Sequence, residues 1–122
     1  AARLAALRAA PADVAALERA VRRGNDAAGF EDFESWDANF HRMLIAAARN
    51  GLLVGLYRTI EAARAERIWG RLKRASLTSE RRRRYEESHA AIAAAIADRD
   101  PARAEAEMRR HIEEVRANMG AG

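Results

Sequence analysis

Residues 30–49 read FEDFESWDANFHRMLIAAAR, and apolar residues recur in this stretch at intervals of three and four. This spacing predicts an amphipathic α-helix with one face packed against a core. Asp37 and His41 lie beside the apolar stripe and are four residues apart, so they share its inward face. The apolar stripe consists of Phe33, Trp36, Phe40, Leu44 and Ala48.

The rest of the chain predicts further helices joined by short turns. Alanine is abundant, aromatic residues are few, and Val, Ile and Thr do not alternate with polar residues, so helix is favoured over sheet. Pro11 and Pro101 suit the first turn of a helix, and Asn50-Gly51 is typical of a left-handed helix end. We therefore expect one all-α domain over residues 1–122, an antiparallel bundle of about six helices. The expected helices cover approximately residues 1–10, 11–25, 30–49, 52–73, 78–97 and 101–119.

The chain has three histidines, and each falls on the apolar stripe of a different expected helix. His89 lies among Tyr85, Ile92 and Ile96, and His111 lies in a similar apolar stripe of the last helix. A single inward histidine is more often a hydrogen-bonded core residue than a ligand. Three such residues on three helices, together with Asp37, predict a metal site in the bundle interior, because buried polar groups need partners. The expected ligands are Asp37, His41, His89 and His111.

This set of donors narrows the choice of metal. Three imidazoles and one carboxylate suit one divalent transition ion such as zinc, nickel, manganese or iron, whereas calcium and magnesium favour more oxygen ligands. An octahedral ion would keep two positions open for water or for a small carboxylate or hydroxy acid. A di-iron centre is not favoured, because it needs two Glu-x-x-His pairs and only Glu86-x-x-His89 is present.

Four other residues are candidates for supporting roles. Glu86 and Glu107 precede His89 and His111 by three and four residues, and either orient those rings or form surface salt bridges. We expect Leu56 and Ile60 to point inward, and the same stripe then brings two arginines toward the interior, where a guanidinium can bind a carboxylate. The alternative for both arginines is a salt bridge with Glu61 or Glu66 at the rim of the bundle. The two arginines are Arg64 and Arg67.

Charge and composition limit the partners. The chain carries 22 basic and 18 acidic residues that are mixed along the sequence, which is weak evidence for nucleic-acid binding. The four arginines at residues 81–84 are more typical of a solvated surface turn than of a phosphate-binding patch. The chain lacks cysteine and has no apolar run near the length of about 20 residues that spans a membrane. We expect a cytoplasmic protein without a membrane partner.

Several motifs resemble those of a known family. They are Asp37-Ala-Asn-Phe-His41, Ala46-Ala-Ala-Arg-Asn50, Glu87-Ser-His89-Ala-Ala-Ile92 and Met108-Arg-Arg-His111. In this order, over nearly the whole chain, they resemble the FCD domain, the effector-binding C-terminal domain of the FadR subfamily of GntR-type bacterial transcription regulators. In metal-binding members the aspartate and histidine of the first motif and the two later histidines bind one divalent ion. The resemblance thus implies the same four ligands.

The resemblance also implies a regulatory function. In such members a small organic acid or related metabolite binds beside the metal and changes the arrangement of paired DNA-binding domains in a homodimer. DNA is read by an N-terminal winged helix-turn-helix, whose pattern these 122 residues lack. We therefore expect a metabolite sensor and not an enzyme. The alternative is a mononuclear metal-dependent hydrolase that uses the same four ligands, although no obvious general base accompanies them.

Overall fold

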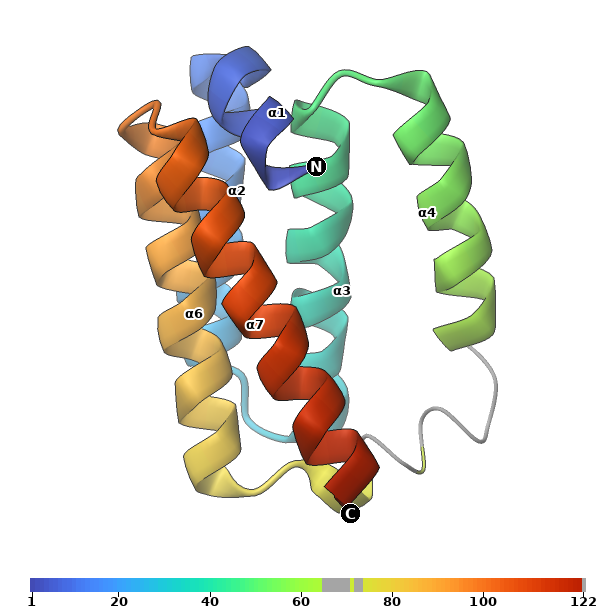
Figure 1. Cartoon of the computed structure of the whole chain (residues 1–122). Helices are drawn as coiled ribbons and strands as arrows, with labels where there is room; N and C mark the ends of the chain where they lie inside the picture. Colours follow the sequence, from blue (N-terminus) through green and yellow to red (C-terminus); the bar gives the residue numbers. More distant parts are fainter. Residues whose placement is uncertain (65–70, 72–73, 122) are drawn as a thin grey trace.

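The computed structural model of the chain describes residues 1–64, 71 and 74–121. These residues form helices and connecting turns without any strand, which confirms the all-α class (Figure 1). None of the helices in this part of the chain is both long enough and apolar enough to cross a membrane. The helices are α1 (Ala2–Arg8), α2 (Pro11–Asn25), α3 (Phe30–Ala47), α4 (Gly51–Arg64), α6 (Ser79–Ala97) and α7 (Pro101–Ala121).

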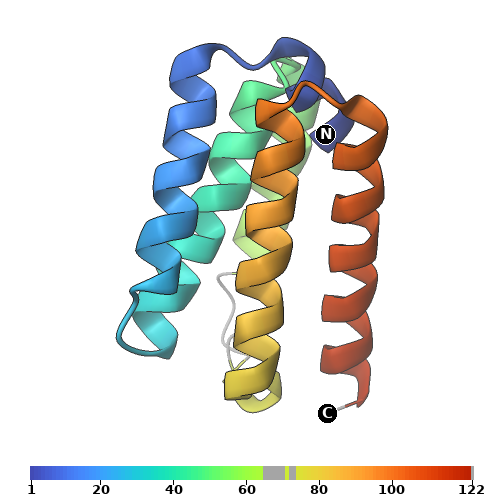
Figure 2. The same ribbon diagram turned by 90° about the vertical axis from the view of Figure 1, so that its left-hand side faces the viewer.

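Four long helices make up the body of the bundle. Helices α2, α3, α6 and α7 run along its length, while the short α1 lies at one end (Figures 1 and 2). Helix α2 packs against α3 and α6, α6 packs against α7, and α1 contacts α3, α6 and α7. Short connections make α2 antiparallel to α3, and α6 antiparallel to α7. The three helices that carry the histidines therefore belong to one packed unit.

Two apolar clusters fill the interior. The larger one includes Phe40 and Leu44 of α3 together with Ile92 of α6, and alanines of α1 allow that helix to approach closely. The smaller one is built around Phe33 of α3 and Tyr85 of α6. Burial of each large apolar side chain contributes about 1.5–3 kcal/mol to folding. On α6, His89 follows Tyr85 of the smaller cluster and precedes Ile92 of the larger one. The histidine of this helix therefore lies where the two clusters meet.

The joints between helices differ from the prediction at one point. Gly51 is the first residue of α4, and the left-handed conformation belongs to Arg49, with a φ of 51°. The expectation of a left-handed cap at Asn50-Gly51 is therefore wrong. The side chain of Asn50 instead caps α4, because its Oδ1 accepts hydrogen bonds from two backbone N–H groups at 3.0 and 3.2 Å. Arg99, with a φ of 54°, and Asp100 repeat this arrangement before α7.

Helix α4 packs at the edge of the bundle, mainly against α3 (Figure 1). The expectation that Leu56 and Ile60 point inward is wrong, since these residues are 58% and 47% exposed. Glu61 of α4 accepts two hydrogen bonds from Arg42 of α3, at 3.2 and 3.3 Å, and this contact raises the pKa of the Arg42 guanidinium. The sequence of α4 contains two apolar stripes, and a different one faces α3. The half-buried side chains of that stripe are Leu53, Val54 and Tyr57.

Candidate metal centre

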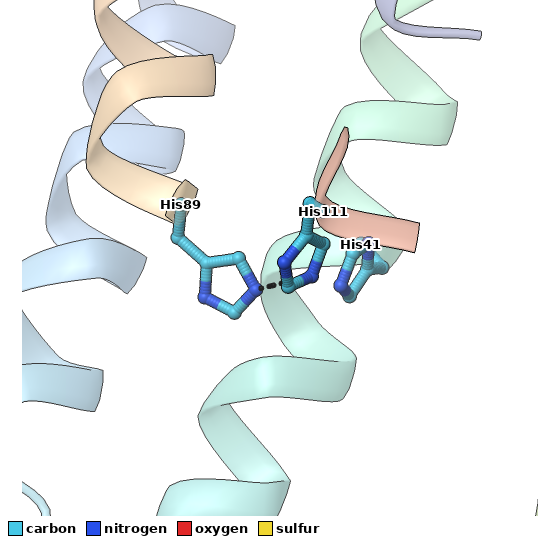
Figure 3. A group of neighbouring side chains, drawn as sticks. All are labelled: His41, His89 and His111. Atoms are coloured by element: carbon cyan, nitrogen blue, oxygen red, sulfur yellow. Dashed lines mark hydrogen bonds between the residues drawn. The ribbon is translucent and has the colours of Figure 1, made fainter. Parts of the chain in front are cut away.

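The three histidines meet in the bundle interior, as predicted. His41 comes from α3, His89 from α6 and His111 from α7 (Figure 3). The ring centroid of His89 is 5.2 Å from that of His41 and 4.8 Å from that of His111. The Nε2 atoms of His89 and His111 are 3.3 Å apart. One nitrogen from each ring lies within 4.8 Å of the other two, so the three rings present their nitrogens to a common space.

Asp37 joins this cluster. Its Oδ1 lies 3.1 Å from Nε2 of His89 and 3.5 Å from Nε2 of His41. The carboxylate is buried, with only 5% of the residue exposed. Asp37 and His41 are one turn apart on α3, which places both side chains on the same face of that helix. The structure thus places Asp37 beside two of the three histidines, His89 and His41, while the group of donor atoms that all lie within 4.8 Å of one another consists of the three histidines.

The distances between the donor atoms fit a shared transition ion. Zinc–nitrogen bonds are about 2.1 Å long, so two ligands of one ion are separated by at most about 4.2 Å. The separations of 3.1 Å and 3.3 Å around His89 Nε2 satisfy this limit. All three nitrogens lie within 4.8 Å of one another, so a pair at that upper bound would have to close by about 0.6 Å to occupy opposite positions on one ion, and by about 1.4 Å to occupy neighbouring positions on a tetrahedral ion. Three imidazole nitrogens and one carboxylate are donors that suit a divalent transition metal.

Aromatic side chains surround the histidines and restrict their rings. Phe40 stacks on His89, with ring centroids 4.5 Å apart and planes inclined by 25°. Its edge also contacts the ring of His41 at 5.4 Å. Tyr85 meets His111 edge-on, at 5.6 Å and 86°. Sequence reasoning placed Phe40 and Tyr85 on the apolar stripes, but did not find their contacts with the rings, because such contacts depend on how the helices pack.

The two glutamates proposed to orient histidine rings are engaged elsewhere. Glu86 accepts a hydrogen bond from Arg82 at 2.9 Å, and Glu107 pairs with Arg110. These are the salt bridges that were considered as the alternative. A role of Glu86 and Glu107 in orienting the rings therefore stays a prediction, and the geometry favours the alternative.

The two arginines proposed to bind an organic acid stay untested. Arg67 lies outside the residues that the structure describes, and so does the side chain of Arg64, the last residue of α4. Their contact with a carboxylate remains a prediction from the sequence alone.

The arginines at residues 81–84 also have structural roles that sequence reasoning missed. Arg82 donates hydrogen bonds to the backbone carbonyls of Gly24 and Ala27, at 3.2 and 2.6 Å, and its guanidinium lies 4.8 Å from the ring centre of Phe33. Arg81 likewise donates to a backbone carbonyl, at 2.8 Å. Arg82 therefore ties the turn between α2 and α3 to α6, and the phosphate-binding alternative gains no support.

The sequence of the chain matches the model of one protein family. The family model described as the FCD domain matches residues 1–114, a range that includes all four predicted ligands. The chain belongs to the FCD family. FCD domains are the effector-binding C-terminal domains of GntR-family transcription regulators. No curated protein matches the chain. The family match confirms the prediction that the chain is a ligand-sensing regulatory domain.

Proposed function

We propose that this FCD domain senses a small organic acid through one bound divalent transition metal. The observation that carries the proposal is the buried group of His41, His89 and His111, whose nitrogens lie within 4.8 Å of one another. Asp37 adds a carboxylate oxygen at 3.1 Å from the nearest of these nitrogens. Zinc, nickel, manganese and iron all accept such donors. The four residues would hold the ion, and the ion would supply a Lewis-acidic centre for an anionic ligand.

The organic acid would bind directly to the metal. Four protein donors leave two positions of an octahedral ion open, and a carboxylate or hydroxy acid supplies two oxygens at a suitable separation. The side chain of His41 is 16% exposed, whereas that of His89 is 6% exposed. Because His41 is the more accessible ring, the acid is proposed to approach the site from its side.

Regulation would follow from a shift between states of a larger protein. We assign residues 1–122 to the effector domain of a cytoplasmic regulator of the FadR subfamily, with a winged helix-turn-helix preceding this domain and a homodimer as the active form. An acid that binds one arrangement of the dimer more tightly shifts the population toward it. DNA binding would change through that shift and not through a contact made by this domain.

The hydrolase alternative gains no support from the geometry. Water activation at a metal is usually assisted by a general base within hydrogen-bonding reach. Glu86 and Glu107, the acids that precede His89 and His111 by about one turn, form ion pairs with Arg82 and Arg110. The family also consists of regulatory domains, so a sensor accounts better for the same four residues.

Calorimetry tests the proposal. Citrate, malate and lactate are titrated into the chain loaded with zinc or nickel and into the chain treated with a chelator. We expect at least one acid to bind only to the loaded chain and to be recovered unchanged afterwards. Equal binding after chelation would contradict the role of the metal, and repeated turnover of a bound acid would favour the enzyme. A His41→Ala variant, treated in the same way, should bind none of the acids.

A further inference from the structure

Tyr85 of α6 contacts two residues of α7, one through its ring and one through its hydroxyl group. Its ring contacts the ring of His111 edge-on, with the centroids 5.6 Å apart. Its hydroxyl oxygen accepts a hydrogen bond from Nδ2 of Asn118 at 2.9 Å. Tyr85 is only 2% exposed and Asn118 is half-buried, so this hydrogen bond lies at the edge of the protein interior. One side chain of α6 therefore engages two separate positions on α7.

The spacing of these residues allows Tyr85 to connect α6 to two successive positions along α7. His111 and Asn118 are seven residues apart, which places them about two turns apart on the same face of α7. Tyr85 precedes His89 by four residues, so these two side chains share a face of α6. A tie between Tyr85 and Asn118 consequently limits how far α7 can slide along α6. The same sliding would change the separation of 3.3 Å between Nε2 of His89 and Nε2 of His111.

The hydroxyl of Tyr85 is not needed for packing. The side chain lies in the smaller apolar cluster with Phe33 and Ala27, and Val115 packs against it. Phenylalanine would fill this space without bringing a buried polar group that requires a partner. The chain instead places a hydroxyl here and supplies Asn118 as its donor. A polar contact in an apolar setting specifies one alignment of the helices, whereas apolar packing tolerates several.

We propose that Tyr85, held by Asn118, is a positioning residue for His111. It sets the ring of His111 and the alignment of α7 on α6 so that His89 and His111 can bind one ion. Neither Tyr85 nor Asn118 contacts the ion. This inference rests on the proposed metal site, and it adds two residues that neither the sequence motifs nor the set of four ligands includes.

Cobalt binding to the full chain tests this role, because the visible absorption of Co²⁺ reports the geometry of its ligands. Tyr85→Phe removes only the hydroxyl, and Asn118→Ala removes the carboxamide that donates to it. We expect each variant to bind Co²⁺ about tenfold more weakly, a typical effect of residues that orient metal ligands, and to shift the absorption bands. The double variant should lose no more than either single variant, because both changes remove the same hydrogen bond.

Glu114→Gln is the matched control. Glu114 pairs with Arg84 across the same two helices, with an N···O distance of 3.7 Å. Its loss removes an interaction between α6 and α7 without removing the hydrogen bond of Tyr85. We expect this variant to keep the wild-type affinity and spectrum.

The possible outcomes separate the inference from the proposed function. If the wild type binds Co²⁺ and Tyr85→Phe and Asn118→Ala bind it equally well, the positioning role is wrong while the metal site stands. A lower affinity with an unchanged spectrum, or an equal loss in Glu114→Gln, shows a general weakening of the bundle and also overturns the positioning role. A wild type that binds no Co²⁺ overturns both.

Discussion

His89 has the central position among the four proposed ligands. Its Nε2 lies 3.1 Å from the carboxylate of Asp37 and 3.3 Å from Nε2 of His111. Phe40 stacks on the same ring at 4.5 Å and so limits its rotation. A ring held in this way offers one nitrogen to the shared space. In the proposed site the carboxylate of Asp37 would place a negative charge beside the divalent ion, and this role can be tested by a change that preserves shape.

Asp37→Asn keeps the size of the side chain and removes its charge. We expect the affinity for zinc to fall at least about tenfold, because even the loss of groups that only orient ligands has an effect of this size. Competition with a chromophoric chelator measures the affinity. Asp32→Asn is the control, since Asp32 is an exposed carboxylate on the same helix. Equal affinities in the wild type and in Asp37→Asn would remove the carboxylate from the site.

Arg82→Lys tests the tie between α6 and the turn that joins α2 to α3. Lysine keeps the charge but lacks the planar fork that reaches the carbonyls of Gly24 and Ala27. We expect the free energy of unfolding to fall by about 1–3 kcal/mol, because the carbonyl of Ala27 loses its donor, whereas that of Gly24 keeps the backbone N–H of Ala27. Urea denaturation measures the change. Arg83→Lys, at an exposed position, should stay within about 0.5 kcal/mol of the wild type, and a similar result for Arg82→Lys would contradict the proposed tie.

At the scale of helices, periodicity in the sequence predicted most of what the structure shows. The recurrence of apolar residues located α3, α6 and α7 and placed one histidine on the inward face of each, and Pro11 marked the start of α2. Periodicity failed for α4, where two apolar stripes compete and only contact with α3 decides between them. The cap signal of Asn50-Gly51 was wrong at the turn before α4, because Arg49 adopts the left-handed conformation that was expected at this pair. Both features depend on contacts between helices, and the local sequence pattern does not show such contacts.

The correction on α4 predicts different costs for the same substitution at two sites. Leu44 of α3 is 1% exposed, whereas Leu56 of α4 is 58% exposed. We expect Leu44→Ala to lower the free energy of unfolding by about 2–5 kcal/mol, because it leaves a cavity in the core. Leu56→Ala should change it by about 0.5 kcal/mol or less. Equal costs in urea denaturation would mean that Leu56 is buried after all.

For the whole molecule, the site lies where three helices and two apolar clusters meet. The sequence predicted which residues converge, because each histidine lies on an inward face. It did not predict the ring contacts of Phe40 and Tyr85 or the hydrogen bond of Asn118, since these depend on the alignment of one helix with another. A bound ion would link α3, α6 and α7 at a single point. Its binding should consequently stabilise the entire fold.

Removal of the metal tests this coupling. An ion present at 100 times its dissociation constant stabilises the folded state by about 2.7 kcal/mol if the unfolded chain does not bind it. We therefore expect the unfolding temperature of the zinc-loaded chain to fall by roughly 10 °C after treatment with a chelator. Differential scanning calorimetry measures the shift. His111→Ala should show little response to the chelator, and an equal response in that variant would place the stabilising ion elsewhere.

X-ray absorption spectroscopy of the chain loaded with one equivalent of zinc tests whether the three histidines and Asp37 bind one ion, because it counts and identifies the ligands of that ion. We expect nitrogen and oxygen neighbours at about 2.0–2.1 Å and an outer scattering pattern of three imidazole rings. A first shell of water and carboxylate oxygens without imidazole scattering would contradict the proposed metal site.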